Sequence, residues 1–134
     1  MTRHEVRLRV RYAETDQMGI VYHANYLVWM EVGRVEYFRN AGMRYADFEK
    51  QTGLHLAVVE ASCRYLSPAR YDDEVAVLTG LGESNPRLVR FEYEIRNAAT
   101  GVVLATGFTR HIFLDGDMKA RKLPVEMRPL FGLA

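Results

Sequence analysis

The sequence lacks the features that mark secreted and membrane proteins. Cys63 is its single cysteine among 134 residues, so no disulfide can form within the chain, and a reducing compartment is expected. No apolar run approaches the roughly 20 residues of a membrane-spanning helix, and residues 1–7 carry charges where a signal peptide needs an apolar segment. We therefore expect a cytoplasmic protein without a membrane span.

The sequence also lacks a charge excess of either sign. Lys and Arg total 18 against 17 Asp and Glu, for a net charge of +1, which gives no broad electrostatic footprint for nucleic acid. His4, His55 and His111 are scattered without ligand spacing, so no metal site is expected. With 49% hydrophobic residues and no linker or repeat, residues 1–134 are predicted to form one globular domain.

Two helices are predicted from spacing. Apolar residues recur at three- and four-residue intervals over residues 24–41 in two adjacent stripes, which indicates a long helix buried on more than one side. Gly42 follows it as a natural stop, and a shorter helix is predicted over residues 45–52, ended by Gly53.

Strands account for most of the remainder. Residues 3–12 alternate with Val6, Leu8, Val10 and Tyr12 on one side, which is typical of a strand with one buried face. Further strands are predicted at 54–65, 73–81, 87–96 and 102–114, the first with a phase shift that indicates a bulge. Short turns between successive strands favour an antiparallel sheet, and the long helix on one face gives an α+β sandwich. The segment from Asp115 onward, rich in Gly, Pro and charged residues, is interpreted as a tail.

The segment over residues 15–26 combines two features that thioester hydrolysis needs. Asp16 precedes the start of the long helix, and Gly19 lets the intervening loop fold back. Main-chain N–H groups at a helix start can stabilise the oxyanion formed when a carbonyl is attacked. The carboxylate can attack the carbonyl itself as a nucleophile or act as general base on water, and the residues leave both routes open.

Residues in this segment resemble a known family. The pattern runs Asp16-x-x-Gly19-x-Val21-Tyr22-His23-x-Asn25-Tyr26, then Glu31-x-Gly33-Arg34, with Tyr65-Leu66-Ser67-Pro68-Ala69 further on. It is similar to the 4-hydroxybenzoyl-CoA thioesterase family of hotdog-fold proteins, and the Tyr22-His23 variant resembles the acyl-CoA thioesterases associated with the Tol–Pal gene cluster.

The resemblance implies a fold and a set of roles. It implies a hotdog fold, with an antiparallel five-stranded sheet wrapped around one long central helix, and a homo-oligomer that is a dimer or a dimer of dimers (a homotetramer). It implies that Asp16 is the catalytic carboxylate and that the His23 N–H is the oxyanion donor. Tyr22 and the His23 side chain match positions that line the thioester site. The matching residues expected to bind substrate are Gly19, Val21, Asn25, Glu31 and Pro68.

The substrate implied is an acyl-CoA, and no separate cofactor is expected because coenzyme A is part of that substrate. Its phosphates need cationic partners, and Lys119, Arg121 and Lys122 form the densest basic cluster in the sequence. A cluster of this kind is more often a solvated tail, and that reading stays open.

Alternative readings remain for several residues. Asp16 could be a turn-forming aspartate, Tyr22 could serve packing alone, and Cys63 is interpreted as inert packing rather than a nucleophile. A hotdog module that binds acyl-CoA without cleaving it, or a hydratase or dehydratase acting on acyl thioesters, are the alternative functions.

Overall fold

A computed structural model describes residues 3–134 of the chain. Two α-helices follow the first strand, and the remaining strands follow the helices. The strands are β1 (Arg3–Arg9), β2 (His55–Tyr65), β3 (Glu74–Leu81), β4 (Leu88–Asn97), β5 (Val103–Leu114) and β6 (Ala120–Arg121), and the helices are α1 (Asn25–Asn40) and α2 (Tyr45–Thr52), with short 3₁₀ helices at Tyr12–Glu14 and Val125–Phe131.

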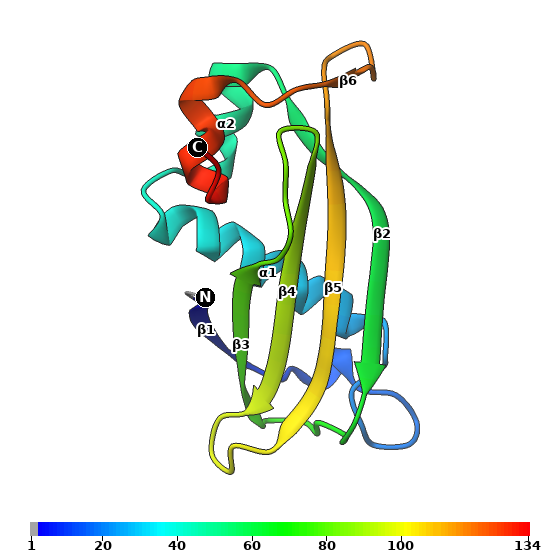
Figure 1. Cartoon of the computed structure of the whole chain (residues 1–134). Coiled ribbons are helices and arrows are strands. Elements are labelled where there is room, and N and C mark those ends of the chain that lie inside the picture. Colours follow the sequence, from blue (N-terminus) through cyan, green and yellow to red (C-terminus); the bar gives the residue numbers. More distant parts are fainter. Residues whose placement is uncertain (1–2) are drawn as a thin grey trace.

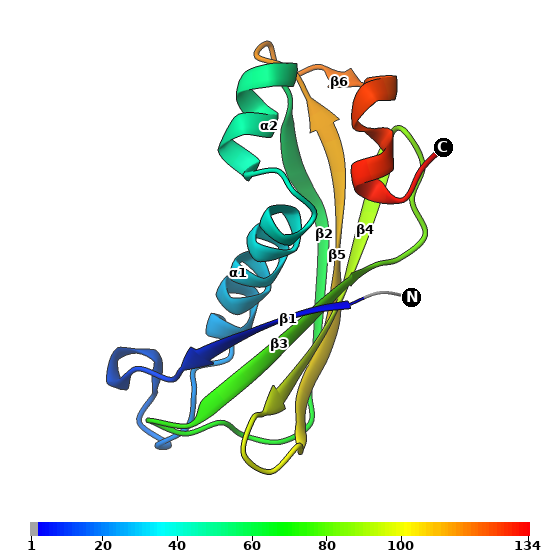
Figure 2. The same ribbon diagram turned by 90° about the vertical axis from the view of Figure 1, so that its left-hand side faces the viewer.

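The strands form one antiparallel sheet with the order β1-β3-β4-β5-β2, and β6 adds to β5. Helix α1 crosses one face of this sheet (Figures 1 and 2). The predicted α+β sandwich is confirmed, with the two-residue β6 as a sixth strand where five were expected. The predicted bulge is also confirmed, because the pairing of β2 with β5 shifts register between Val58 and Glu60.

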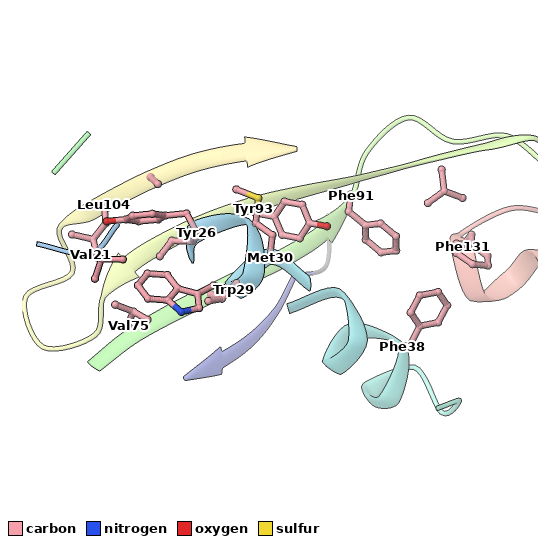
Figure 3. Close-up of a cluster of buried hydrophobic side chains, with 14 of the residues drawn as sticks. Val21, Tyr26, Trp29, Met30, Phe38, Val75, Phe91, Tyr93, Leu104 and Phe131 are labelled. Atoms are coloured by element: carbon pink, nitrogen blue, oxygen red, sulfur yellow. The ribbon is translucent and has the colours of Figure 1, made fainter. Parts of the chain in front are cut away.

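Helix α1 packs on the sheet through residues from both of its apolar stripes. The buried residues of α1 are Tyr26, Trp29, Met30, Gly33 and Phe38. In Figure 3, the side chains of Tyr26, Trp29 and Met30 lie near Val75, Tyr93 and Leu104 of the sheet. The N-terminal half of α1 also has an uncovered side, since Leu27 and Val28 are exposed. In the single chain, the helix is therefore buried toward the sheet and open to one flank.

Gly33 allows the helix to approach the sheet closely. A Cβ atom at this position would lie 2.4 Å from the hydroxyl oxygen of Thr79 and 2.9 Å from a methyl carbon of Val77. Both distances are too short for a side chain, so any larger residue would push α1 away from β3.

Two predictions at the ends of the chain were wrong. The first strand ends at Arg9 rather than residue 12, and Tyr12, expected on the buried side, is exposed in a 3₁₀ turn. The segment after Asp115 is not a tail outside the fold, because it forms β6 and a 3₁₀ helix whose Phe131 is buried against Phe38 with ring centres 5.3 Å apart. Figure 3 shows these two rings close to one another, and they meet edge to face.

Candidate functional site

The loop that carries Asp16 is a tight turn, here called the Asp16 loop (residues 15–21). The Asp16 N–H donates to the Ile20 carbonyl at 2.8 Å, and the Gly19 N–H donates to the Asp16 carbonyl at 2.9 Å. Gly19 has a φ of 77°, a left-handed conformation that glycine adopts readily. The prediction that Gly19 makes a sharp turn is therefore confirmed.

The Asp16 carboxylate takes part in this turn with one of its oxygens. Oδ1 accepts a hydrogen bond from the Met18 N–H at 2.8 Å, as aspartates in turns commonly do. Among residues 3–134, no hydrogen bond or ion pair reaches Oδ2. The turn thus fixes the carboxylate while leaving one oxygen available.

Glu14 anchors the Asp16 loop to α1, and sequence reasoning missed it. Its carboxylate is buried and accepts hydrogen bonds from the Arg11 N–H at 2.8 Å and the Trp29 indole N–H at 2.9 Å. Its carbonyl oxygen accepts from the Tyr22 N–H at 2.8 Å and from the Asn25 side-chain amide at 2.9 Å. Asn25, expected to bind substrate, therefore ties the helix start to Glu14.

The start of α1 presents unpaired main-chain donors. The Tyr22 carbonyl accepts from the Asn25 N–H at 3.0 Å, and the His23 carbonyl accepts from the Tyr26 N–H at 3.3 Å. Within the described part of the chain, the N–H groups of His23 and Ala24 donate to no other main-chain group. These two amides match what an oxyanion-binding site requires.

A cleft of about 320 Å³ opens beside His23, and we call it the Tyr65 cleft. The Tyr65 ring meets the rings of His23 and Tyr26 edge-on, with centres 6.1 Å and 5.2 Å apart. Val21 and Pro68, both predicted to bind substrate, lie in its wall. The full lining is Ile20, Val21, His23, Tyr26, Tyr65, Leu66, Ser67 and Pro68.

Asp16 does not line the Tyr65 cleft of the single chain. It lines an adjacent concavity of about 430 Å³ with Tyr12, Ala13, Thr15 and Gln17. The connection between the two is Ile20, which lines the cleft and is hydrogen-bonded to Asp16. Tyr22 lies between them in sequence, with its ring half exposed and 4.6 Å from that of His23.

Glu31 lies at a different cavity, further along α1. This cavity of about 140 Å³ is also lined by Arg34, Phe38, Tyr45 and Leu56. Although Glu31 and Arg34 are three residues apart, they form no ion pair among the described residues.

A buried polar network occupies the sheet face under α1. His111 is fully buried and contacts the Thr109 hydroxyl at 2.8 Å, which also contacts the Tyr93 hydroxyl at 2.6 Å. Burial, with a smaller contribution from the nearby Arg34 charge, lowers the pKa of His111 to about 4. This histidine is therefore neutral at physiological pH.

The basic cluster of Lys119, Arg121 and Lys122 is exposed and follows β5. It lies at the end of the molecule opposite the Asp16 loop, where β6 is labelled in Figures 1 and 2. Arg121 is already engaged, because its guanidinium donates to Asp115 at 2.7 Å. Within one chain, the basic cluster and the Tyr65 cleft are thus well separated.

Comparison with known proteins identifies the family. The profile of the Thioesterase-like superfamily matches residues 10–131. The chain belongs to the Thioesterase-like superfamily. It is 41% identical over 124 residues to a putative acyl-CoA thioesterase, YneP, of Bacillus subtilis, a match that covers 92% of this chain and 86% of the relative.

Solved structures of thioesterases share the fold. The DHNA-CoA thioesterase of Staphylococcus aureus is similar with a TM-score of 0.86 and 35% identity, covering 91% of this chain and 81% of that one. A 4-hydroxybenzoyl-CoA thioesterase is similar in fold, with a TM-score of 0.87 at 18% identity, covering 96% and 98% of the two chains. The predicted hotdog fold and the family resemblance are both confirmed, and this member of the superfamily is a thioesterase.

Two further findings concern the described residues 3–134. No helix among them is long and apolar enough to cross a membrane. No three of their His, Cys, Asp or Glu side chains are grouped closely enough to hold a metal ion.

Proposed function

We propose that this thioesterase hydrolyses acyl-CoA to a free acid and CoA, with Asp16 as the catalytic carboxylate. The observation that carries the proposal is the pair of unpaired amides of His23 and Ala24 at the start of α1. His23 lines an aromatic cleft. The residues on either side of the two amides, Tyr22 and Asn25, are hydrogen-bonded to the carbonyl of Glu14, which precedes the loop that carries Asp16.

The chemistry follows from where charge develops. Attack on the thioester carbonyl places negative charge on its oxygen, and one fixed N–H donor stabilises such an oxyanion by about 3 kcal/mol. As a nucleophile, the free Oδ2 of Asp16 forms a mixed anhydride and releases the CoA thiolate, after which water opens the anhydride. As a general base, the same oxygen takes the proton of the attacking water. Neither route calls for a cofactor, since coenzyme A arrives with the substrate.

A second copy of the chain would complete the site. Strand β2 is an outer strand of the sheet, with Val58 and Val59 half exposed, and Leu27 and Val28 are uncovered on α1. A long apolar edge strand is a ready surface for pairing, and a two-fold dimer applies the same surface twice. Antiparallel pairing of two β2 strands would place the Tyr65 end of one beside the His55 end of the other.

This pairing would also bring together the basic cluster and the Tyr65 cleft, which are far apart within one chain. His55 pairs with Leu114, and Leu114 pairs with Ala120 of β6, so the basic cluster lies at the His55 end. In the proposed dimer, the basic cluster of one protomer therefore approaches the Tyr65 cleft of the other and can contact the phosphates of CoA. A dimer of dimers would keep this pairing unchanged.

The alternatives make different demands on Asp16. A module that merely binds acyl-CoA gains nothing from a fixed carboxylate near a developing oxyanion. A hydratase or dehydratase needs its base at the acyl α-carbon rather than at the carbonyl. The tight turn that holds Asp16 next to the helix-start segment favours hydrolysis.

Asp16→Asn is the direct test of the proposal. Asparagine retains the oxygen that accepts from Met18, so the turn should survive while the charge is lost. We expect release of free thiol from acyl-CoA, followed with a chromogenic thiol reagent, to fall more than about 100-fold. The denaturation midpoint and the oligomeric state should match those of the unaltered protein.

Glu83→Gln serves as the matched control, because the Glu83 side chain is exposed in the turn before β4 and lies outside the Tyr65 cleft, the Asp16 concavity and the basic cluster. Near-normal turnover by Asp16→Asn would refute the catalytic assignment. Mass spectrometry of the products separates hydrolysis from hydration, since a hydrated or dehydrated acyl-CoA would retain its thioester.

A further inference from the structure

Tyr65 stands at the end of β2, where that strand reaches the start of α1. Its hydroxyl donates a hydrogen bond to the His23 carbonyl at 3.0 Å. The Tyr26 N–H also donates to this carbonyl, but over a longer distance of 3.3 Å, beyond the usual optimum for N–H to oxygen bonds. The shorter of the two bonds that orient this carbonyl thus comes from another element of the fold.

A fixed carbonyl also fixes the amide that shares its peptide group. The His23 carbonyl and the Ala24 N–H belong to the same planar unit and point in opposite directions. When Tyr65 holds the carbonyl, the Ala24 N–H is held facing away from the body of the helix. This amide donates to no other main-chain group in residues 3–134.

We propose that Tyr65 is a positioning residue for this thioesterase, which locks the His23–Ala24 peptide so that the Ala24 N–H acts as a second oxyanion donor beside that of His23. The inference rests on the proposed acyl-CoA hydrolysis and adds a residue from β2 to the site. The Tyr65 ring itself lines the cleft, so the acyl thioester would lie close to the peptide that Tyr65 orients.

The chemistry of the tyrosine suits a permanent donor. Burial, together with the neighbouring Cys63 thiol and Tyr26, raises the pKa of Tyr65 to about 12. The hydroxyl therefore keeps its proton throughout the pH range in which thioesters are enzymatically cleaved. Edge contacts with the rings of His23 and Tyr26 restrict the ring orientation.

The kinetic consequence is specific to the transition state. Negative charge on the carbonyl oxygen develops during attack, so a better-aligned N–H raises kcat more than it improves ground-state binding. Tyr65→Phe removes the hydroxyl while keeping the ring that lines the cleft. We expect kcat for acyl-CoA to fall about tenfold, the order expected for one weakened hydrogen bond, with KM changed less than about twofold.

Tyr37→Phe is the matched control. Tyr37 lies on α1, and the centres of its ring and that of Phe91 are 5.8 Å apart. It lies outside the lining of the Tyr65 cleft. Removing its hydroxyl should leave kcat and KM for acyl-CoA as they are. Urea denaturation of both variants shows whether either hydroxyl supports the fold rather than the reaction.

Two inhibitors test the mechanism apart from turnover. A CoA trifluoromethyl ketone forms a tetrahedral oxyanion-like species, and its Ki should rise about tenfold in Tyr65→Phe. An S-alkyl CoA thioether has no carbonyl oxygen, and its Ki should not change. A merely structural role for Tyr65 would weaken both inhibitors alike.

The outcomes separate this inference from the proposed function. If the unaltered protein releases no thiol from acyl-CoA, the proposed function fails. If it does, and Asp16→Asn abolishes release while Tyr65→Phe retains full kcat, the positioning role alone is overturned. The positioning role would also be overturned if Tyr65→Phe raised KM as much as it lowered kcat, or if it weakened both inhibitors equally.

Discussion

The carboxylate of Glu14 accepts a hydrogen bond from the indole N–H of Trp29 at 2.9 Å, in the interior between α1 and the Asp16 loop. The same carboxylate accepts from the Arg11 N–H, and the Glu14 carbonyl accepts from Tyr22 and Asn25. One buried residue therefore connects both ends of the Asp16 loop to the helix whose first amides form the proposed oxyanion site.

Glu14→Gln should weaken both the fold and the site. Glutamine keeps the shape but replaces one carboxylate oxygen with an amide NH₂ that would face the N–H of Arg11 or Trp29. Loss of one buried hydrogen bond of this kind costs about 1–3 kcal/mol. We expect the free energy of unfolding, measured with urea, to fall by that amount, and thiol release to fall with it.

Glu83→Gln is the control for this change, because Glu83 is exposed in the turn before β4. An unaltered unfolding midpoint for Glu14→Gln would show that the buried carboxylate is not needed to anchor the loop.

Gly33→Ala should destabilise the protein through a steric clash. The new Cβ would lie 2.4 Å from the Thr79 hydroxyl oxygen, and overpacking of this kind typically costs about 1–3 kcal/mol. Gly116→Ala is the control, since nothing lies within 4 Å of a Cβ there. Urea denaturation measures both variants.

A double variant tests the cause of this loss. Thr79→Ala removes the clashing hydroxyl, so the Gly33→Ala/Thr79→Ala protein should cost less stability than the sum of the single changes. Some cost should persist, because the Val77 methyl remains 2.9 Å from the new Cβ. Simple additivity would rule out the contact with Thr79 as the source.

The helices were predictable because their signals are local. The long helix, predicted over residues 24–41, is found at Asn25–Asn40, and the second matches its predicted residues 45–52. Apolar spacing and the stops at Gly42 and Gly53 act within a few residues of one another. The burial of Phe131 could not be predicted in the same way, because its partners Phe38 and Phe113 come from distant parts of the sequence.

In the candidate site too, local features were predictable from the sequence and contacts between distant residues were not. The turn at Gly19 and the open helix start follow from residues that are close in sequence. Glu14 gave no signal, because a lone acidic residue before a loop is usually exposed, and its partner Trp29 lies 15 residues away. The hydrogen bond from the Tyr65 hydroxyl to the His23 carbonyl joins residues 42 positions apart. The motif over residues 65–69 therefore indicated the family but could not predict this contact.

His111 should make the folded protein sensitive to mild acid. Its pKa is 6.5 ordinarily and about 4 in the folded state, chiefly because of burial. The unfolded chain therefore binds a proton between these values while the folded protein does not, so stability is full above about pH 6.5 and falls as the pH drops toward 4. This difference in the pKa of His111 corresponds to a loss of about 3 kcal/mol in the free energy of unfolding between pH 6.5 and pH 4.

Urea midpoints at several pH values between 7.5 and 4.5 check this prediction. His111→Gln should be less stable at pH 7.5 but should lose less stability on acidification than the unaltered protein. His4→Gln, on β1, is the control and should retain the original acid sensitivity. Parallel pH curves for His111→Gln and the unaltered protein would show that this buried imidazole does not set the dependence.

The basic cluster should act on the CoA part of the substrate. Lys119 and Lys122 are exposed, whereas Arg121 is held by Asp115, so the two lysines are the side chains free to contact phosphate. Replacing both with alanine should raise KM for acyl-CoA by about tenfold, the lower end for lost charged hydrogen bonds. KM for the corresponding acyl-pantetheine, which lacks the nucleotide phosphates, should stay nearly the same.

Ionic strength gives an independent check, because exposed charges are screened within about 8 Å at physiological salt. Added salt should raise KM for acyl-CoA in the unaltered protein and have less effect in the double-lysine variant. Lys50→Ala, on the exposed side of α2, should behave like the unaltered protein. If the double-lysine variant raised KM equally for acyl-CoA and acyl-pantetheine, the basic cluster would not bind the phosphates of CoA. The proposed contact between this cluster and the partner's Tyr65 cleft would then be refuted.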